Sequence, residues 1–128
     1  MDSYDESYAL GRAFHEALAA GDWDLIRSLL HDEAVWVLPG DNAVSGEARG
    51  ADAVVERART IAGYGLDFGL LHILVSRDNM ALSLHNTARR EDRVLDEYVI
   101  TVCAVHEGKI SDIETYLSDV AMMDAFFV

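Results

Sequence analysis

The sequence predicts an α+β fold, in which helices from the first half of the chain pack on an antiparallel sheet formed by the second half. Two observations support this fold class. Apolar residues recur at helical spacing near the start of the chain, whereas residues 66–119 form four apolar or alternating runs separated by three tight turns. Because helices come first and strands last, the two kinds of element are segregated, as in α+β domains.

Length and composition fit one globular domain that spans residues 1–128. Hydrophobic residues make up 51% of the chain and charged residues 26%, and the formal net charge is −13 at pH 7. This charge argues against nucleic acid and anionic membranes as partners, because phosphate groups would be repelled. No apolar run reaches membrane-spanning length, and no signal peptide is expected. The lone Cys103 cannot form an intrachain disulfide, which fits a cytoplasmic location.

The first elements are two helices in sequence. Apolar residues from Tyr4 to Leu18 follow helical spacing, and Gly21 is placed to end that helix. Asp22 can cap a second helix, whose apolar stripe runs from Trp23 to Leu30.

A short strand and a third helix follow. The strand covers Ala34–Leu38 and ends at Pro39-Gly40, and residues 41–50 form a loop with room for one brief strand. Apolar residues from Ala51 to Ala62 mark the third helix. Beyond the four-strand meander, the apolar tail Asp119–Phe127 is expected to be helical.

The meander has turns at Ser76–Asn79, Arg90–Arg93 and His106–Lys109. If each turn has two central residues, the strand register follows by counting. The expected pairs are Val75 with Met80, Leu70 with His85, His85 with Tyr98, and Tyr98 with Leu117.

Alternation then divides the meander into two faces. One face mixes apolar bulk with polar groups such as His72, His85, Tyr98 and Thr115, and the other is almost wholly apolar. We assign the helices to the mixed face, because a pocket needs polar groups inside an apolar enclosure. The apolar face is too large to leave in water and predicts a homodimer. Its residues are Leu71, Ile73, Leu82, Leu84, Val99 and Val105.

Three short motifs carry a resemblance to a known family. They are Ala20-Gly21-Asp22-Trp23, Val35-Trp36-Val37-Leu38-Pro39 and Gly108-Lys109-Ile110. In this order they resemble the SnoaL-like branch of the nuclear transport factor 2-like superfamily, which is related to ketosteroid isomerases, polyketide cyclases and limonene epoxide hydrolase. The resemblance implies a cone-shaped α+β barrel, with N-terminal helices on a strongly curved mixed or antiparallel sheet around a central cavity, usually in a dimer.

The departures from this family pattern are informative. Where ketosteroid isomerases have an acid or base, this chain has Phe14, Leu38 and about Ile100, so steroid isomerase activity is not expected. Asp119 matches the acid/base of SnoaL-like cyclases at the end of the last strand, although a helix cap is an equal alternative. The arginine-bridged carboxylates of the epoxide hydrolases are not matched.

The expected catalytic residues are His85, Tyr98 and Asp119, with His85 as base, Tyr98 as hydrogen-bond donor and Asp119 exchanging protons with water. The expected substrate-binding residues line the same cavity. They are His72, Phe14, Trp36, Leu38, Ile100 and Thr115. A metal site from His72, His85 and Asp119 is conceivable, but we expect neither a metal nor another cofactor.

Three functions fit these residues. The first is a cofactor-independent cyclase, isomerase or dehydratase that acts by general acid/base catalysis on a small hydrophobic, oxygenated metabolite such as a polyketide. The second is a non-catalytic protein that binds such a molecule. The third is an epoxide-opening enzyme that uses a carboxylate-activated water.

Overall fold

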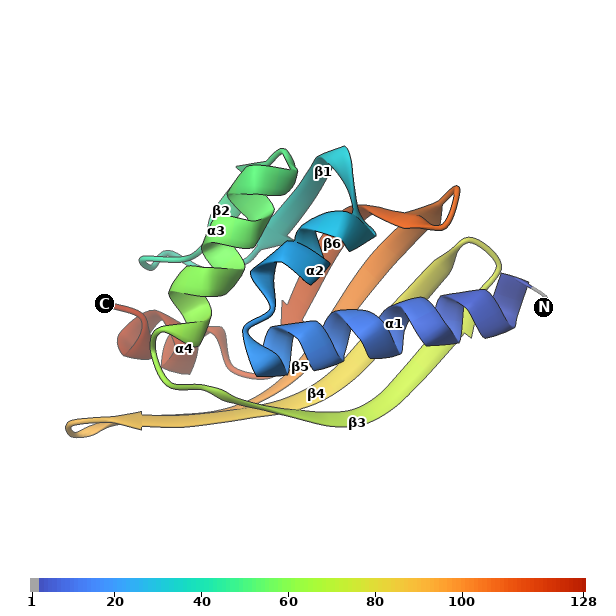
Figure 1. Cartoon of the computed structure of the whole chain (residues 1–128). Helices are drawn as coiled ribbons and strands as arrows, with labels where there is room; N and C mark the ends of the chain where they lie inside the picture. Colours follow the sequence, from blue (N-terminus) through green and yellow to red (C-terminus); the bar gives the residue numbers. More distant parts are fainter. Residues whose placement is uncertain (1–2) are drawn as a thin grey trace.

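A computed structural model describes residues 3–128, with side chains from Tyr4 onward. In this part of the chain, four helices accompany one six-stranded sheet (Figure 1). The helices are α1 (Ser3–Ala20), α2 (Trp23–Leu29), α3 (Ala51–Ala62) and α4 (Val120–Phe126). The strands are β1 (Leu30–Leu38), β2 (Gly46–Arg49), β3 (Asp67–Ser76), β4 (Asn79–Arg90), β5 (Arg93–His106) and β6 (Lys109–Leu117).

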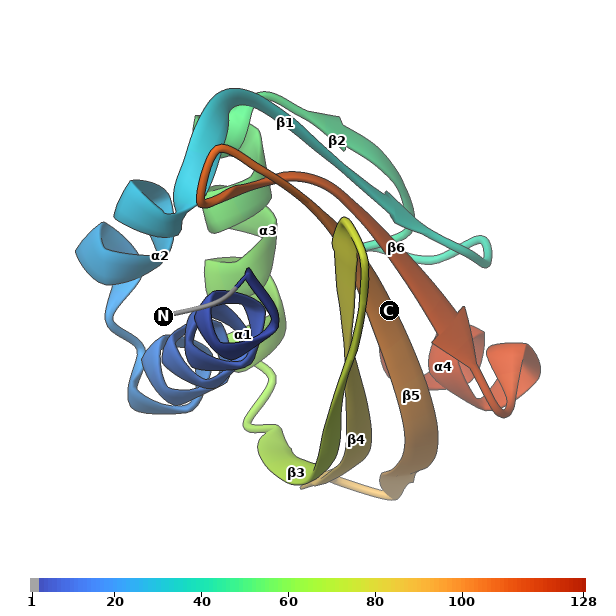
Figure 2. The same ribbon diagram turned by 90° about the vertical axis from the view of Figure 1, so that its right-hand side faces the viewer.

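The sheet has the strand order β2-β1-β6-β5-β4-β3. Strands β1 and β6 run parallel and all other neighbours are antiparallel, so the sheet is mixed. Figure 2 shows the sheet curving around α1 and α3, with β2 and β3 as open edges. The prediction of an α+β fold with helices on a strongly curved mixed sheet is confirmed.

All three turns of the meander have the predicted length of two central residues. The flanking pairs are Ser76 with Asn79, Arg90 with Arg93, and His106 with Lys109. Left-handed backbone closes two of the turns, with φ of 56° at Glu91 and of 51° and 78° at the Glu107-Gly108 turn.

Two β-bulges interrupt the register that counting predicts. In β3, Leu71 is unpaired, so Leu70 lies opposite Leu84 rather than the predicted His85. In β6, Ser111 is unpaired, so Leu117 lies opposite Val99 rather than the predicted Tyr98. A bulge inserts one extra residue in one strand only. Every residue of that strand beyond the bulge therefore points to the face opposite to the one that counting from the turn predicts.

The helices cover the apolar face of the central strands, not the mixed face that we predicted. Leu82, Leu84 and Val99 are 1%, 4% and 5% exposed and pack beneath the helices, as does Cys103. Burying the more apolar of two faces removes more hydrocarbon from water, which explains the outcome. The predicted dimer face is therefore wrong, because Leu82, Leu84 and Val99 belong to the core of a single chain.

The helices are fixed by local signals and close packing. The Asp22 carboxylate accepts a hydrogen bond from the Leu25 N–H at the start of α2. Gly11 lets α1 lie directly on the sheet, since a Cβ there would come within 3.2 Å of the Ile73 side chain and 3.3 Å of Met80. In residues 3–128 no helix is both long and apolar enough to cross a membrane.

Candidate functional site

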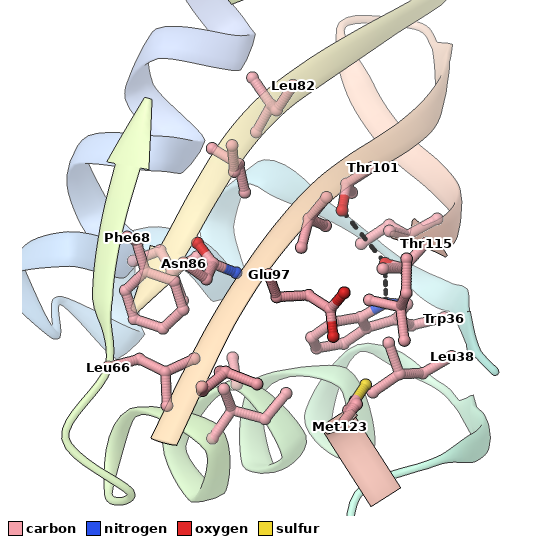
Figure 3. A pocket seen from close by; sticks show the side chains of 18 of the residues that line it. Trp36, Leu38, Leu66, Phe68, Leu82, Asn86, Glu97, Thr101, Thr115 and Met123 are labelled. Carbon is pink, nitrogen blue, oxygen red and sulfur yellow. Dashed lines mark hydrogen bonds between the residues drawn. The ribbon is translucent and has the colours of Figure 1, made fainter. Parts of the chain in front are cut away.

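A cavity of about 70 Å³ lies between the helices and the concave face of the sheet (Figure 3). Four polar side chains and the Trp36 indole interrupt an otherwise apolar wall. The four are Asn86, Glu97, Thr101 and Thr115. The apolar residues of the wall are Phe14, Leu18, Leu38, Ala58, Ile61, Leu66, Phe68, Leu82, Leu84, Leu95, Val99, Ile113, Leu117, Met123 and Phe127.

Asn86 and Glu97 form a directly opposed cross-strand pair on β4 and β5. Side chains in such a pair have Cβ atoms about 4.5–5.5 Å apart. Both residues are buried, at 9% and 1% exposure, and both point to the cavity in Figure 3. Within residues 3–128, the buried side-chain oxygens without a hydrogen-bond partner are Asn86 Oδ1 and Glu97 Oε1. The cavity therefore offers two acceptor atoms whose hydrogen bonds remain to be made.

The two oxygens of the Glu97 carboxyl group have different environments. Oε2 accepts hydrogen bonds from Ser118 Oγ at 2.7 Å and from the Asp119 backbone N–H at 2.6 Å, whereas Oε1 accepts none. Burial raises the pKa of Glu97, and these two hydrogen bonds oppose the rise without cancelling it. Glu97 is thus a buried acid that holds its proton to higher pH than an ordinary glutamate.

The same face of the sheet carries a short chain of hydrogen bonds that runs from β5 through β6 to β1. Trp36 Nε1 donates to Thr115 Oγ1 at 2.9 Å, and Thr115 Oγ1 lies 3.1 Å from Thr101 Oγ1 (Figure 3). The Arg57 guanidinium, which does not line the cavity, lies over the Trp36 ring and donates to the Trp36 carbonyl at 2.9 Å. Desolvation lowers the pKa of Arg57. These contacts hold the indole in place and leave Glu97 as the one ionisable residue of the cavity wall within residues 3–128.

Four of the predicted site residues do line this cavity: Phe14, Trp36, Leu38 and Thr115. Phe14 and Leu38 are 6% and 3% exposed and supply apolar wall where an isomerase would have an acid and a base. Their role in binding a substrate remains a prediction.

Four other predicted site residues lie on the outer face of the sheet, so their placement in the cavity is wrong. The predicted pairing of His85 with Tyr98 is present, and their rings stack with centroids 4.4 Å apart, but on the side away from the helices. His85 Nε2 contacts Asp96 Oδ1 at 2.5 Å, and Tyr98 is 56% exposed. His72 and Ile100 are exposed on the same side.

Asp119 acts as the N-cap of α4, where its carboxylate accepts a hydrogen bond from the Met122 N–H at 3.0 Å. It touches the site through its backbone N–H, which donates to Glu97. In the described part of the chain, no three His, Cys, Asp or Glu side chains are grouped so that they could hold a metal ion. The conceivable set of His72, His85 and Asp119 is accordingly not assembled.

Sequence reasoning missed Asn86 and Glu97, although alternation contains a signal for both. Leu84 and Val99 belong to the apolar face. Asn86 stands two residues after Leu84, and Glu97 stands two residues before Val99. A carboxylate in line with core positions is unusual, because a buried charge is costly. Glu97 could have been found if the apolar face had been chosen as the covered one.

Helices that pack on a curved, open sheet and enclose an apolar cavity with one buried acid define a class of α+β domain with a central pocket. A family model described as "SnoaL-like domain" matches residues 11–113, and the chain belongs to this family. No curated protein matches the chain.

Solved structures agree with the family assignment. Bal32a, from a soil-derived mobile gene cassette, has a TM-score of 0.92 at 25% identity, covering 97% of this chain and 98% of its own. An NTF2-like protein from Burkholderia xenovorans LB400 has a TM-score of 0.82 at 16% identity, with 95% and 96% covered. An LEH-like epoxide hydrolase from M. tuberculosis has a TM-score of 0.73 at 21% identity, with 96% and 90% covered. The last two show the fold alone.

Proposed function

We propose that the protein is a cofactor-independent enzyme that moves a proton on a small, apolar, oxygen-bearing metabolite, in the manner of a SnoaL-like cyclase or isomerase. The observation that carries the proposal is Glu97 Oε1, a carboxyl oxygen buried in an apolar cavity without a hydrogen-bond partner. Glu97 takes the role that sequence reasoning gave to His85.

The chemistry follows from the environment of Glu97. As a neutral acid it can donate a proton to a carbonyl or enolate oxygen, and as a carboxylate it can remove a proton from the carbon next to a carbonyl. A raised pKa brings both forms closer to neutral pH, where a group that gives and takes protons is most effective. The Asn86 amide, directly opposite, is placed to bind the same substrate oxygen.

The size of the cavity limits the substrate. A volume of about 70 Å³ fits a compact molecule or one end of a larger one. A fused-ring polyketide requires the wall to move, and α4 with its following residue contributes Met123 and Phe127 to that wall. We therefore propose a monocyclic or short-chain ketone, or the ketone end of a longer chain, as the group that binds next to Glu97.

A binding protein without catalysis is the second candidate. One observation favours it, namely that Glu97 is the single ionisable residue of the described cavity wall, so that no second residue is at hand to complete an acid/base pair. An epoxide-opening mechanism through arginine-bridged carboxylates has less support, because the described wall contains no arginine.

The experiment that separates these candidates uses cyclohexanone and 2-cyclohexenone as probes in D₂O. NMR measures both their binding and the exchange of their α-protons. We expect exchange that falls by about 10²–10⁴-fold in Glu97→Gln, the usual contribution of a positioned acid/base group. Glu114→Gln, which removes an exposed carboxylate from β6, is the matched control and should exchange like the wild type. Binding of these ketones with no catalysed exchange would support the binding protein, and exchange unaffected by Glu97→Gln would refute the proposal.

We also propose a homodimer, through the outer face of the sheet instead of the face predicted from sequence. Leu74, Tyr98, Ile100 and Tyr116 are exposed there, at 50%, 56%, 39% and 53%. The chain carries a formal net charge of −13, so two copies can approach with less repulsion through this group of apolar and aromatic side chains than through the more acidic parts of the surface. Sedimentation velocity should show a dimer that Ile100→Lys dissociates, and a wild-type monomer at micromolar concentration would contradict this.

A further inference from the structure

Ser118, directly after β6, is in contact with both sides of the sheet. It is exposed on the outer side, where it lines a shallow groove of about 280 Å³ together with Ser83, Tyr98 and Tyr116. Its hydroxyl group also reaches the buried carboxyl of Glu97, at 2.7 Å. Ser118 is therefore the side-chain contact between the cavity acid and the outer surface.

The direction of the hydrogen bonds around Ser118 is fixed by its neighbour on β5. The Tyr98 N–H donates to Ser118 Oγ at 2.9 Å, and the Ser118 N–H donates to the Tyr98 carbonyl, also at 2.9 Å. A serine hydroxyl has one hydrogen to give, and with Oγ already accepting from Tyr98 that hydrogen points to Glu97 Oε2. The Asp119 N–H donates to the same oxygen at 2.6 Å.

Two donors therefore point at Oε2 and none at Oε1. A proton on Oε2 would clash with the hydrogens of these two donors and displace a hydrogen bond, whereas a proton on Oε1 displaces none. In the neutral acid the proton consequently resides on Oε1, and in the ionised form the two donors stabilise the charge on Oε2.

We propose that Ser118 is a positioning residue for Glu97: it holds Oε2 and thereby keeps Oε1 as the oxygen that carries and exchanges the proton with the cavity ligand. This inference rests on the proposed role of Glu97, but its geometry exists without a ligand and can be tested in the free protein.

The other charged groups near Glu97 are few. The Asp119 carboxylate is occupied as the cap of α4, and its negative charge raises the pKa of Glu97 slightly. The Arg57 guanidinium lies over the Trp36 ring and does not line the cavity. The hydrogen bond from Ser118 lowers the pKa of Glu97 against the larger effect of burial, so that its removal should let this pKa rise further.

The experiment is a pH titration of the Glu97 side-chain carboxyl by carbon-detected NMR on the ligand-free, full-length protein. A hydrogen bond to a charged group is worth roughly one to two pH units of pKa, and Ser118→Ala should raise the Glu97 pKa by about that amount. Ser118→Thr keeps the hydroxyl group and should restore the wild-type value. Ser83→Ala, which removes a hydroxyl from the same outer groove, is the matched control and should leave the titration unchanged.

The possible outcomes separate this inference from the proposed function. An unchanged Glu97 titration in Ser118→Ala would overturn the positioning role, whatever the ketone exchange assay gives. A raised pKa that Ser118→Thr reverses would support it, even if ketones bind without exchange and the protein proves to be a binding protein. Should Ser118→Ala fail to fold, Ser118→Cys provides a weaker donor of similar size, and its Glu97 pKa should lie above the wild-type value.

Discussion

Replacing Glu97 with glutamine should change how the free energy of unfolding depends on pH. Burial raises the pKa of Glu97 in the folded protein above its ordinary value of 4.5, which applies to the unfolded chain. The folded state therefore binds this proton more tightly. The resulting stabilisation is fully present below the unfolded pKa and is lost as the pH rises through the folded pKa. Between these two pKa values, the free energy of unfolding of the wild type falls by about 1.4 kcal/mol for each unit by which the folded pKa is raised.

The Glu97→Gln variant lacks this dependence, because an amide does not titrate. Its oxygen can still accept from Ser118 and Asp119, and its nitrogen takes the place of Oε1 on the side of Asn86, so the amide resembles the neutral acid. The wild type should thus lose stability relative to the variant as the pH rises from 5.

Urea unfolding followed by tryptophan fluorescence, at pH 5 to 9, measures this difference directly. Trp36 lines the same cavity, so its fluorescence changes when the cavity unfolds. Glu114→Gln removes an exposed carboxylate from β6 and should keep a constant difference from the wild type. If the difference for Glu97→Gln is also constant over this range, Glu97 has an ordinary pKa and the reasoning about its burial is refuted.

Three further predictions concern other parts of the chain. Gly69→Ala should lower the free energy of unfolding by about 1–3 kcal/mol, since the new Cβ would lie 2.9 Å from the His85 carbonyl oxygen; an unchanged urea midpoint would contradict this. Cys103 should not react with a maleimide at pH 8 before unfolding, because burial raises the pKa of its thiol to about 12; rapid labelling of the folded protein would count against it. Asp124→Ala should cost about 1–3 kcal/mol and speed hydrogen exchange in α4, because Asp124 Oδ1 accepts from Asn42 Nδ2 at 2.7 Å; wild-type protection of α4 would argue that this contact is dispensable.

Local signals in the sequence were sufficient for the order of the elements and for the turns, although β1 begins at Leu30 and not at the predicted Ala34. Each hairpin turn of the meander has the predicted two central residues, and Asp119 caps the predicted C-terminal helix. These features depend on residues close together in the chain. Counting from the turns also paired His85 with Tyr98 correctly.

The choice of the covered face could not be made in this way, because it depends on which side of the sheet buries more apolar surface against distant helices. The polar side chains on the side of His85 favour that side as a pocket wall, whereas packing favours the side of Leu84 and Val99. Thr115 nevertheless lies in the cavity as predicted, because two errors cancel. Counting puts Thr115 on the face of His85, which the helices do not cover, and the bulge at Ser111 moves it to the face of Leu84 and Val99, which they do cover. The two bulged residues, Leu71 and Ser111, are not glycines and have no other sequence feature that predicts a bulge.

The bulge at Ser111 makes the wall of the cavity depend on the register of β6 as much as on the identity of its residues. If Ser111 paired with Ala104 instead of staying unpaired, Tyr98 would lie opposite Leu117 and the rest of β6 would turn over. Ile113, Thr115 and Leu117 would leave the wall, and Asp112, Glu114 and Tyr116 would replace them. A slip of one residue would thus exchange an apolar wall for one with two carboxylates and a phenol, while the strand order stayed the same. Deleting Ser111 would instead remove the bulge and keep every pair beyond it, so the pocket tolerates the loss of this residue but not its entry into the ladder.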